Sequence, residues 1–185
     1  MNQLESRADM TFAHATYICL DLPDPQAQFI LNIKKHQHDK FRAALPAEIT
    51  IAGSSGVGVI KAGQEPAFVF STLQNIATHT KPITASFGRV LRFPRTDIFV
   101  LTLQDETPFR ELHQRIAVSG ISFEPNPFPF QPHCTLRSRS PVSPEEEAEL
   151  LSLHVPGIFT LDTLSVYMLE NLPMTLLYQV KLKGS

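Results

Sequence analysis

The chain has 185 residues, of which 43% are hydrophobic and 18% are charged, and its formal net charge is −2. This composition is typical of a folded globular protein and excludes an intrinsically disordered chain. The small negative charge provides no general attraction to duplex nucleic acid, so a nucleic-acid ligand would have to be small or held by a local basic cluster. No apolar run is long enough to span a membrane, and the polar segment 1–10 does not resemble a secretion signal.

The chain contains two cysteines, Cys19 and Cys134, and their spacing is not that of metal ligands. This sparse use of cysteine fits a reducing compartment. We therefore expect a cytoplasmic protein that needs no metal and no cofactor.

Hydrophobic periodicity predicts alternating strands and helices along the first half of the chain. The expected elements are a strand over 11–22, a helix over 25–44, a short strand over 48–51, a helix from Pro66 and a strand over 82–91. Asp24 precedes Pro25 and is expected to cap the first helix, since aspartate before proline is a common start signal.

The second half repeats this order. The expected elements are a strand over 96–103, a helix from Thr107 to Gly120, a strand over 133–137, a helix over 144–153, and strands over 158–169 and 175–183. Ser143 and Glu146 form a capping-box pattern for the helix over 144–153. Segment 123–132 contains four prolines, so it is expected to be extended but unable to pair fully in a sheet.

This repetition predicts the architecture. The separation from Phe12 to Glu48 equals that from Asp97 to His133. Two such halves can pack as similar lobes with their short strands side by side. We expect an α/β (α+β) fold: a single two-lobed domain over 1–185, with small, mainly antiparallel sheets and helices on the outside around a central cleft. The halves would span about 11–91 and 96–170, followed by the strand over 175–183.

The stretch from Gln131 to Arg137 holds the main functional candidates. Its alternation predicts a strand with His133, Thr135 and Arg137 on one face. An imidazole, a hydroxyl and a guanidinium on one face suit a phosphate. In the side-by-side model, Glu48 faces His133 and Thr50 faces Thr135 across the two short strands.

These residues resemble the two-histidine (2H) phosphoesterase superfamily, which includes bacterial RNA 2′,5′-ligase-like proteins and cyclic phosphodiesterases. Pro132-His133-Cys134-Thr135-Leu136-Arg137 is similar to the second His-x-Thr motif of that family, and the segment from Leu45 to Ile51 lies where the first motif belongs. The resemblance implies a base and an acid acting on a cyclic or 2′,5′ phosphodiester, with both threonines holding phosphate oxygens.

The chain departs from the family pattern at Glu48, where the first motif has a histidine. A glutamate–histidine pair can in principle provide a base and an acid. However, a carboxylate about 4 Å from a phosphate repels it by roughly 1 to 4 kcal/mol. Glu48 therefore needs a raised pKa or a neighbouring arginine such as Arg137 or Arg139, unless the site has lost turnover.

The resulting prediction is a phosphoesterase-like monomer that acts on a nucleotide or a short RNA end. His133 and Glu48 would be catalytic, and Thr50, Thr135 and Arg137 would bind substrate. One alternative is a degenerate member that binds a nucleotide or other anion without turnover. Another is a site that has changed to a non-phosphate substrate.

Two further features leave alternatives open. His79-Thr80 is a rival first motif, but Lys81-Pro82 follows it instead of a strand. Phe123, Phe128 and Phe130 are expected in the core, although one of them could stack on a base beside the phosphate.

Overall fold

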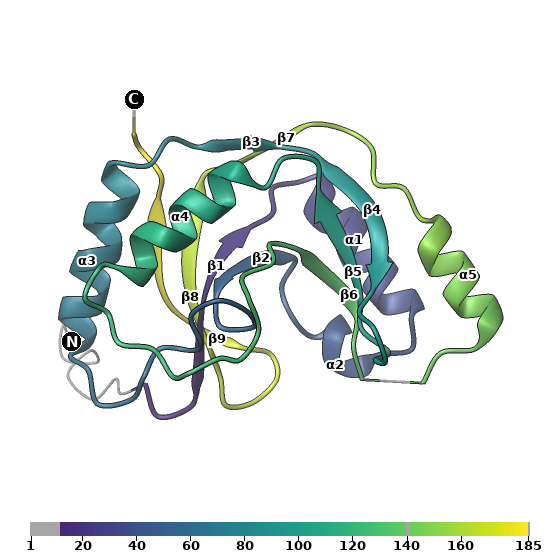
Figure 1. Ribbon diagram of the computed structural model, residues 1–185, viewed down its shortest axis with the longest axis horizontal. Coiled ribbons are helices and arrows are strands. Elements are labelled where there is room, and N and C mark those ends of the chain that lie inside the picture. The colour runs from purple at the N-terminus through teal and green to yellow at the C-terminus, as the bar shows by residue number, and fades with distance from the viewer. Residues whose placement is uncertain (1–11, 140, 185) are drawn as a thin grey trace, which may run out of the picture.

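The computed structural model describes residues 12–139 and 141–184 (Figure 1). The helices are α1 (Gln26–His36), α2 (Lys40–Ala43), α3 (Pro66–Thr78), α4 (Thr107–Ala117) and α5 (Pro144–Ser152). The strands are β1 (Ala15–Asp21), β2 (Glu48–Ala52), β3 (Ile83–Ala85), β4 (Phe87–Arg92), β5 (Phe99–Leu103), β6 (Cys134–Arg137), β7 (Phe159–Leu161), β8 (Thr163–Leu169) and β9 (Thr175–Lys181). The polar segment 1–10 and the first residue of the strand expected over 11–22 lie outside the described residues.

The strands form three small antiparallel sheets. Their orders are β2-β1-β8-β9, β4-β5-β6 and the pair β3-β7. This confirms the expected α+β class with small antiparallel sheets and helices. The two motif strands, β2 and β6, are edge strands of different sheets, and they contact each other near the centre of the molecule (Figure 1).

Each large sheet takes strands from both halves of the sequence. β8 of the second half pairs with β1, and β4 of the first half pairs with β5. The strand expected over 158–169 is accordingly divided into β7 and β8, which join different sheets. The strand expected over 82–91 is divided in the same way into β3 and β4. The sheets therefore do not coincide with the two sequence halves.

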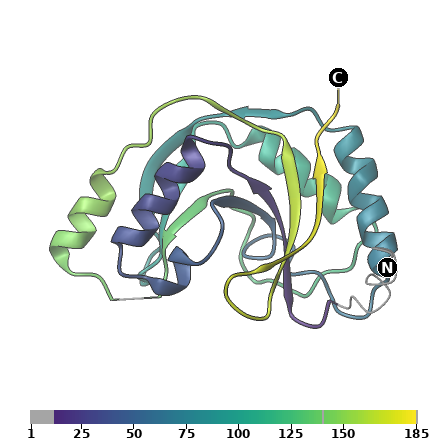
Figure 2. The same ribbon diagram turned by 180° about the vertical axis from the view of Figure 1, so that it is seen from behind.

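The helices cover the sheets from outside. α3 packs on β9 and α5 on β4, at opposite ends of the molecule in both views (Figures 1 and 2). α1 contacts β6, and α4 contacts β2. Apolar residues of these helices and of the inward strand faces form one continuous core, which includes Ile18, Leu20, Ile49, Ile51 and Leu136.

The helix expected over 25–44 is two helices with a break between them. His38 has a φ of 55°, a left-handed conformation that cannot continue a right-handed helix. Asp39 then caps α2 by accepting a hydrogen bond from the Arg42 backbone N–H at 3.0 Å. Asp24 was expected to cap the first helix; instead Pro25 is at the cap position, and α1 has no side-chain cap.

The same pairing irregularity occurs in both motif strands. Cys19 pairs with Thr50 while Ile18 pairs with Ala52, so β2 has one extra residue there. Val100 pairs with Thr135 while Phe99 pairs with Arg137, so β6 also has one extra residue. An extra residue interrupts the strict alternation of side chains along a strand. The two sequence halves therefore also share a one-residue shift in strand pairing, directly after Thr50 in β2 and directly after Thr135 in β6.

In the part of the chain that the structure describes, no helix is long and apolar enough to cross a membrane.

Candidate functional site

A small pocket lies where the two motif strands meet, with a volume of about 140 Å³. It is lined by Tyr17, Cys19, Phe41, Arg42, Leu45, Glu48, Thr50, Gly53, Ser54, Thr135, Leu169 and Met174. Three of the five predicted site residues, namely Glu48, Thr50 and Thr135, are therefore brought to one cavity. They come from edge strands of two different sheets.

Glu48 and Thr50 are on the same face of β2 and bond to each other. The Thr50 hydroxyl donates to Oε2 of Glu48 at 2.9 Å. A hydroxyl has only one proton to donate. Thr50 was predicted to donate that proton to a phosphate oxygen, but here it donates it to Glu48. Oγ1 of Thr135 makes no hydrogen bond within residues 12–139 and 141–184, so it can donate to a ligand.

His133 directly precedes β6, and its ring is held in one orientation. Nδ1 lies 2.6 Å from the Gln131 carbonyl oxygen. Because a carbonyl can only accept, Nδ1 carries a proton and Nε2 is left for chemistry. The Gln131 backbone N–H in turn donates to the Ser55 hydroxyl at 3.0 Å, so a loop of the first half holds the histidine of the second.

Burial lowers the pKa of His133. The hydrogen bond to Gln131 and the charge of Glu48 act in the opposite direction, while Arg42 lowers the pKa further. His133 is 8% exposed, which explains why desolvation dominates. The histidine is therefore biased toward its neutral form at neutral pH.

Arg42 is a pocket residue that the sequence analysis missed. Its Nε donates to the Ser138 hydroxyl at 2.7 Å, and its two terminal nitrogens have no hydrogen-bond partner in the described part of the chain. Burial lowers the Arg42 pKa, and the charge of Glu48 is the strongest influence that raises it. A guanidinium with two free donor groups beside a carboxylate offsets the repulsion that Glu48 would exert on a phosphate.

Asp39 places this arginine. It is 3% exposed, and its carboxylate accepts from the backbone N–H groups of Arg42, Ser138 and Arg139 at 3.0, 2.7 and 2.9 Å. Burial raises the pKa of Asp39, but the three hydrogen bonds outweigh it and the pKa is lowered. The sequence signal that could have indicated Arg42 is an Asp-x-x-Arg pattern, Asp39 to Arg42, which ends six residues before Glu48.

The pocket wall also includes Tyr17, whose pKa is raised by burial. Its ring passes over Gly53, where a Cβ atom would lie 2.3 Å from Cδ1 of the tyrosine. Gly53 has a φ of 142°, which L side chains rarely adopt. Glycine at this turn therefore makes room for the aromatic wall.

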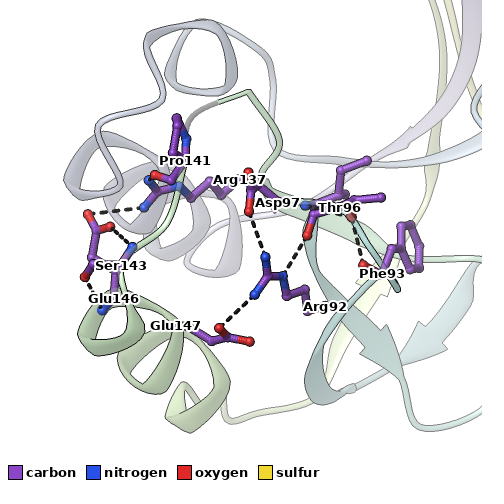
Figure 3. Close-up of polar contacts among 10 residues, drawn as sticks. Arg92, Phe93, Thr96, Asp97, Arg137, Pro141, Ser143, Glu146 and Glu147 are labelled. Carbon is purple, nitrogen blue, oxygen red and sulfur yellow. Dashed lines mark hydrogen bonds and ion pairs between the residues drawn. The ribbon is translucent and has the colours of Figure 1, made fainter.

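Arg137 is not brought to the pocket. It is 2% exposed, and its guanidinium bonds to the Pro141 carbonyl and to Oε1 of Gln37 at 3.5 Å. It also pairs with Oε1 of Glu146 at 3.3 Å (Figure 3). The expected alternation put Arg137 on the face of His133 and Thr135. The extra residue in β6 interrupts that alternation, and Arg137 holds the start of α5.

The remaining candidates are also placed. Phe130 is buried and stacks on His113 at 3.9 Å, whereas Phe128 is 64% exposed. His79 lines a separate cavity between α4 and the segment 79–84. Neither Phe128 nor His79 lines the pocket of Glu48. Within the described residues, no group of three or more His, Cys, Asp and Glu side chains could hold a metal ion.

The arrangement can move protons and hold an anion. Glu48, Thr135 and Arg42 line the pocket, whereas His133, two residues before Thr135, does not. A carboxylate and an imidazole are groups that can exchange protons, while Thr135 and Arg42 can donate to the oxygens of a ligand. These four groups come from β2, the start of β6, β6 itself and α2.

Comparisons with known proteins agree with this description of the fold. Residues 22–171 match the model of the 2′-5′ RNA ligase superfamily. TT0787 of Thermus thermophilus has 14% sequence identity and a TM-score of 0.65 over 92% of this chain and 99% of that chain. E. coli LigT, crystallised with 3′-AMP, has 14% identity and a TM-score of 0.58 over 92% and 98%. A structure described as a phosphoesterase has 15% identity and a TM-score of 0.56 over 92% and 99%. No curated protein matches the chain.

Proposed function

Because the chain belongs to the 2′-5′ RNA ligase superfamily, we propose that it is a phosphoesterase that hydrolyses a cyclic or 2′,5′ phosphodiester of a nucleotide or RNA end. His133 and Glu48 move the protons, and no metal is required. The observation that carries this proposal is the single pocket in which Glu48 and Thr50 of β2 meet Thr135 of β6 and the half-buried Arg42.

In the proposed reaction, Glu48 is the base and His133 is the acid. Glu48 takes a proton from water as the water oxygen attacks phosphorus. The bond from phosphorus to one ribose oxygen breaks, and Nε2 of the protonated His133 gives that oxygen its proton. Exchange with solvent then restores the starting protonation of both residues.

The charge that develops on the phosphate oxygens is held by Arg42 and Thr135. Arg42 supplies two donor groups and a positive charge, and Thr135 supplies one hydroxyl. Thr50 orients the carboxylate of Glu48 through its 2.9 Å bond, and it can contact phosphate only by giving up that bond. Arg137, which was predicted to bind substrate, acts here through the position of α5.

The ligand class follows from the solved relatives by analogy. E. coli LigT has been crystallised with 3′-AMP, with ATP and with NADP+. Their likeness to this chain is a likeness of fold. A nucleotide is the proposed ligand because Arg42 and Thr135 suit a phosphate and the aromatic wall suits a base or sugar.

The test is hydrolysis of nucleoside 2′,3′-cyclic phosphates and 2′,5′-linked dinucleotides by the purified protein. Replacing the acid or base of such a pair typically lowers the rate by about 10² to 10⁴-fold. We expect losses of that size for His133→Ala and for Glu48→Gln. His154→Ala, which changes an exposed histidine outside the pocket, is the matched control and should keep wild-type activity. Wild-type protein without turnover of either substrate would refute the proposal.

A second candidate function is binding without turnover. It is favoured by the bond between Thr50 and Glu48, which uses one phosphate donor and leaves a carboxylate in the pocket. Glu48→His separates the two functions. If the site binds without turnover because the first histidine was lost, this variant should gain hydrolysis. If Glu48 is the working base, Glu48→Gln should abolish hydrolysis, and wild-type protein should already turn substrate over.

A further inference from the structure

The β4–β5 hairpin adjoins the proposed acid, although none of its residues lines the pocket. The ring of Phe93, at the start of the turn, meets the ring of His133 edge-on. The two centroids are 5.4 Å apart and the interplanar angle is 87°. Phe93 is half-buried, while His133 is buried. The phenyl ring therefore covers part of the imidazole that would otherwise face solvent.

The turn that holds Phe93 is fixed by many hydrogen bonds. The Phe93 backbone N–H donates to the Ile98 carbonyl at 3.0 Å. The Phe93 carbonyl accepts from the hydroxyl and the backbone N–H of Thr96 at 2.9 and 3.2 Å. The Thr96 hydroxyl also accepts from the Ile98 N–H at 3.1 Å. The backbone of Phe93 consequently has little freedom to move.

One arginine ties this turn to α5. Nε of Arg92 donates to the Thr96 carbonyl at 2.6 Å, and its terminal nitrogens pair with Asp97 at 2.8 Å and with Glu147 at 2.7 Å (Figure 3). These ion pairs are partly exposed, so each contributes little to stability by itself. Their shared effect is geometric, because a single planar guanidinium at the end of β4 bonds both to the turn and to α5.

We propose that Phe93 is a positioning residue for His133: its ring fixes the rotation of the His133 imidazole and excludes water from one side of it. The hydrogen bond from Nδ1 to Gln131 and the contact with Phe93 together restrict both side-chain torsions, so Nε2 points in one direction. This inference rests on the proposed role of His133 as the acid. It adds a residue that does not line the pocket.

The proposal predicts a change in how His133 titrates. The charged groups that face this histidine are Glu48 from β2, which raises its pKa, and Arg42 from α2, which lowers it. Removing the phenyl ring changes neither charge. It admits water to the imidazole, which relieves the desolvation that lowers the pKa.

The experiment is a proton NMR titration of the imidazole Cε1–H of His133, assigned by its absence in His133→Gln. In Phe93→Ala and in Phe93→Gln, which keeps a long side chain, the pKa of His133 should rise toward the ordinary value of about 6.5. Phe93→Tyr keeps the ring and should titrate like wild type. Phe128→Ala is the matched control, because Phe128 is an exposed phenylalanine outside the pocket and should leave the titration unchanged.

A wild-type titration in folded Phe93→Ala or folded Phe93→Gln would overturn the proposal. If Phe93→Ala does not fold, Phe93→Gln decides the question alone. The titration requires no turnover, so the two proposals fail separately. A shifted titration in a protein without phosphodiesterase activity keeps Phe93 as the positioning residue and refutes the function. If the wild-type protein is an active phosphodiesterase but the His133 titration is unshifted in the Phe93 variants, the proposed function stands and the role of Phe93 is refuted.

Discussion

At the scale of single residues, the central question is how a glutamate would work at the position where the resemblance implies a histidine. Glu48 accepts from Thr50 and faces Arg42, while His133 has Nδ1 bonded to a carbonyl and a lowered pKa. The two proposed proton-transfer groups are therefore chemically different. In a pair of this kind, the carboxylate is the natural base and the imidazolium the natural acid.

This assignment predicts the pH dependence of activity. The active form has Glu48 ionised and His133 protonated, and burial makes His133 harder to protonate than an ordinary histidine. As the pH rises through the lowered pKa of His133, the acid is lost. We expect kcat/KM to fall with rising pH, with the descending limb below about pH 6.5. A rate that rises with pH below about 6.5 and then stays level would instead assign His133 as the base.

Arg42 predicts how tightly the pocket holds an anion. Hydrogen bonds to charged groups contribute about 1.5–3 kcal/mol, so Arg42→Gln should weaken the binding of 3′-AMP by about tenfold or more. Arg89→Gln is the matched control. Arg89 is an exposed arginine of β4 and does not line the pocket, so its removal should change the affinity little. Isothermal titration calorimetry measures both variants, and equal losses would contradict a specific role for Arg42.

At the scale of elements, short capped helices place the functional groups. α2 has only four residues and would be marginal by itself, because a helix gains stability only after its first turns. The carboxylate of Asp39 makes it stable by capping its start and by bonding the backbone that follows β6. α5 is held similarly by a capping box in which Glu146 also pairs with Arg137.

Asp39→Ala should therefore reduce both stability and ligand affinity. Loss of an N-cap typically costs about 0.5–2 kcal/mol, and the two further N–H groups lose their acceptor as well. Because Asp39 positions α2, the variant should also weaken 3′-AMP binding through Arg42. Asp105→Ala, which removes the acceptor of the Thr107 N–H at the start of α4, is the control. It should lower stability, measured by urea unfolding, without changing affinity.

At the scale of the whole molecule, contacts cross between the two sequence halves. His113 of α4 donates from Nδ1 to the Ile51 carbonyl in β2 at 2.8 Å, directly after the pairing shift at Thr50. Burial lowers the pKa of His113, and it also lowers that of His133. The folded state thus contains two histidines that resist protonation.

These histidines predict an acid-sensitive fold. Between the lowered pKa values and about 6.5, the unfolded chain binds more protons than the folded one, so stability rises with pH. The free energy of unfolding should fall as the pH drops below about 6.5, by at most about 1.4 kcal/mol per pH unit for each histidine. His113→Gln should flatten this dependence in urea titrations at pH 5 to 7.5. An unchanged slope would show that His113 does not contribute.

Local sequence patterns predicted much of the fold, because hydrophobic period, proline and capping signals act over a few residues. The strand of Thr135, the helix after Ser143 and its capping box, and the repeated order of elements all follow from neighbouring side chains. The break at His38 and the division of the strands over 82–91 and 158–169 do not. They depend on which sheet each segment joins, and that choice depends on residues distant in the sequence.

For the site, the sequence by itself determined the candidates: two short strands, each with a polar residue two positions before a threonine. Tertiary structure alone decided how they act together. It brought Arg42 into the pocket, kept Arg137 out of it through one extra residue in β6, and put Phe93 against His133. The physical reason is the distance along the sequence over which each effect acts. A strand pattern sets which way side chains point along a few residues, whereas burial, charge and ring contacts depend on which distant segments pack together.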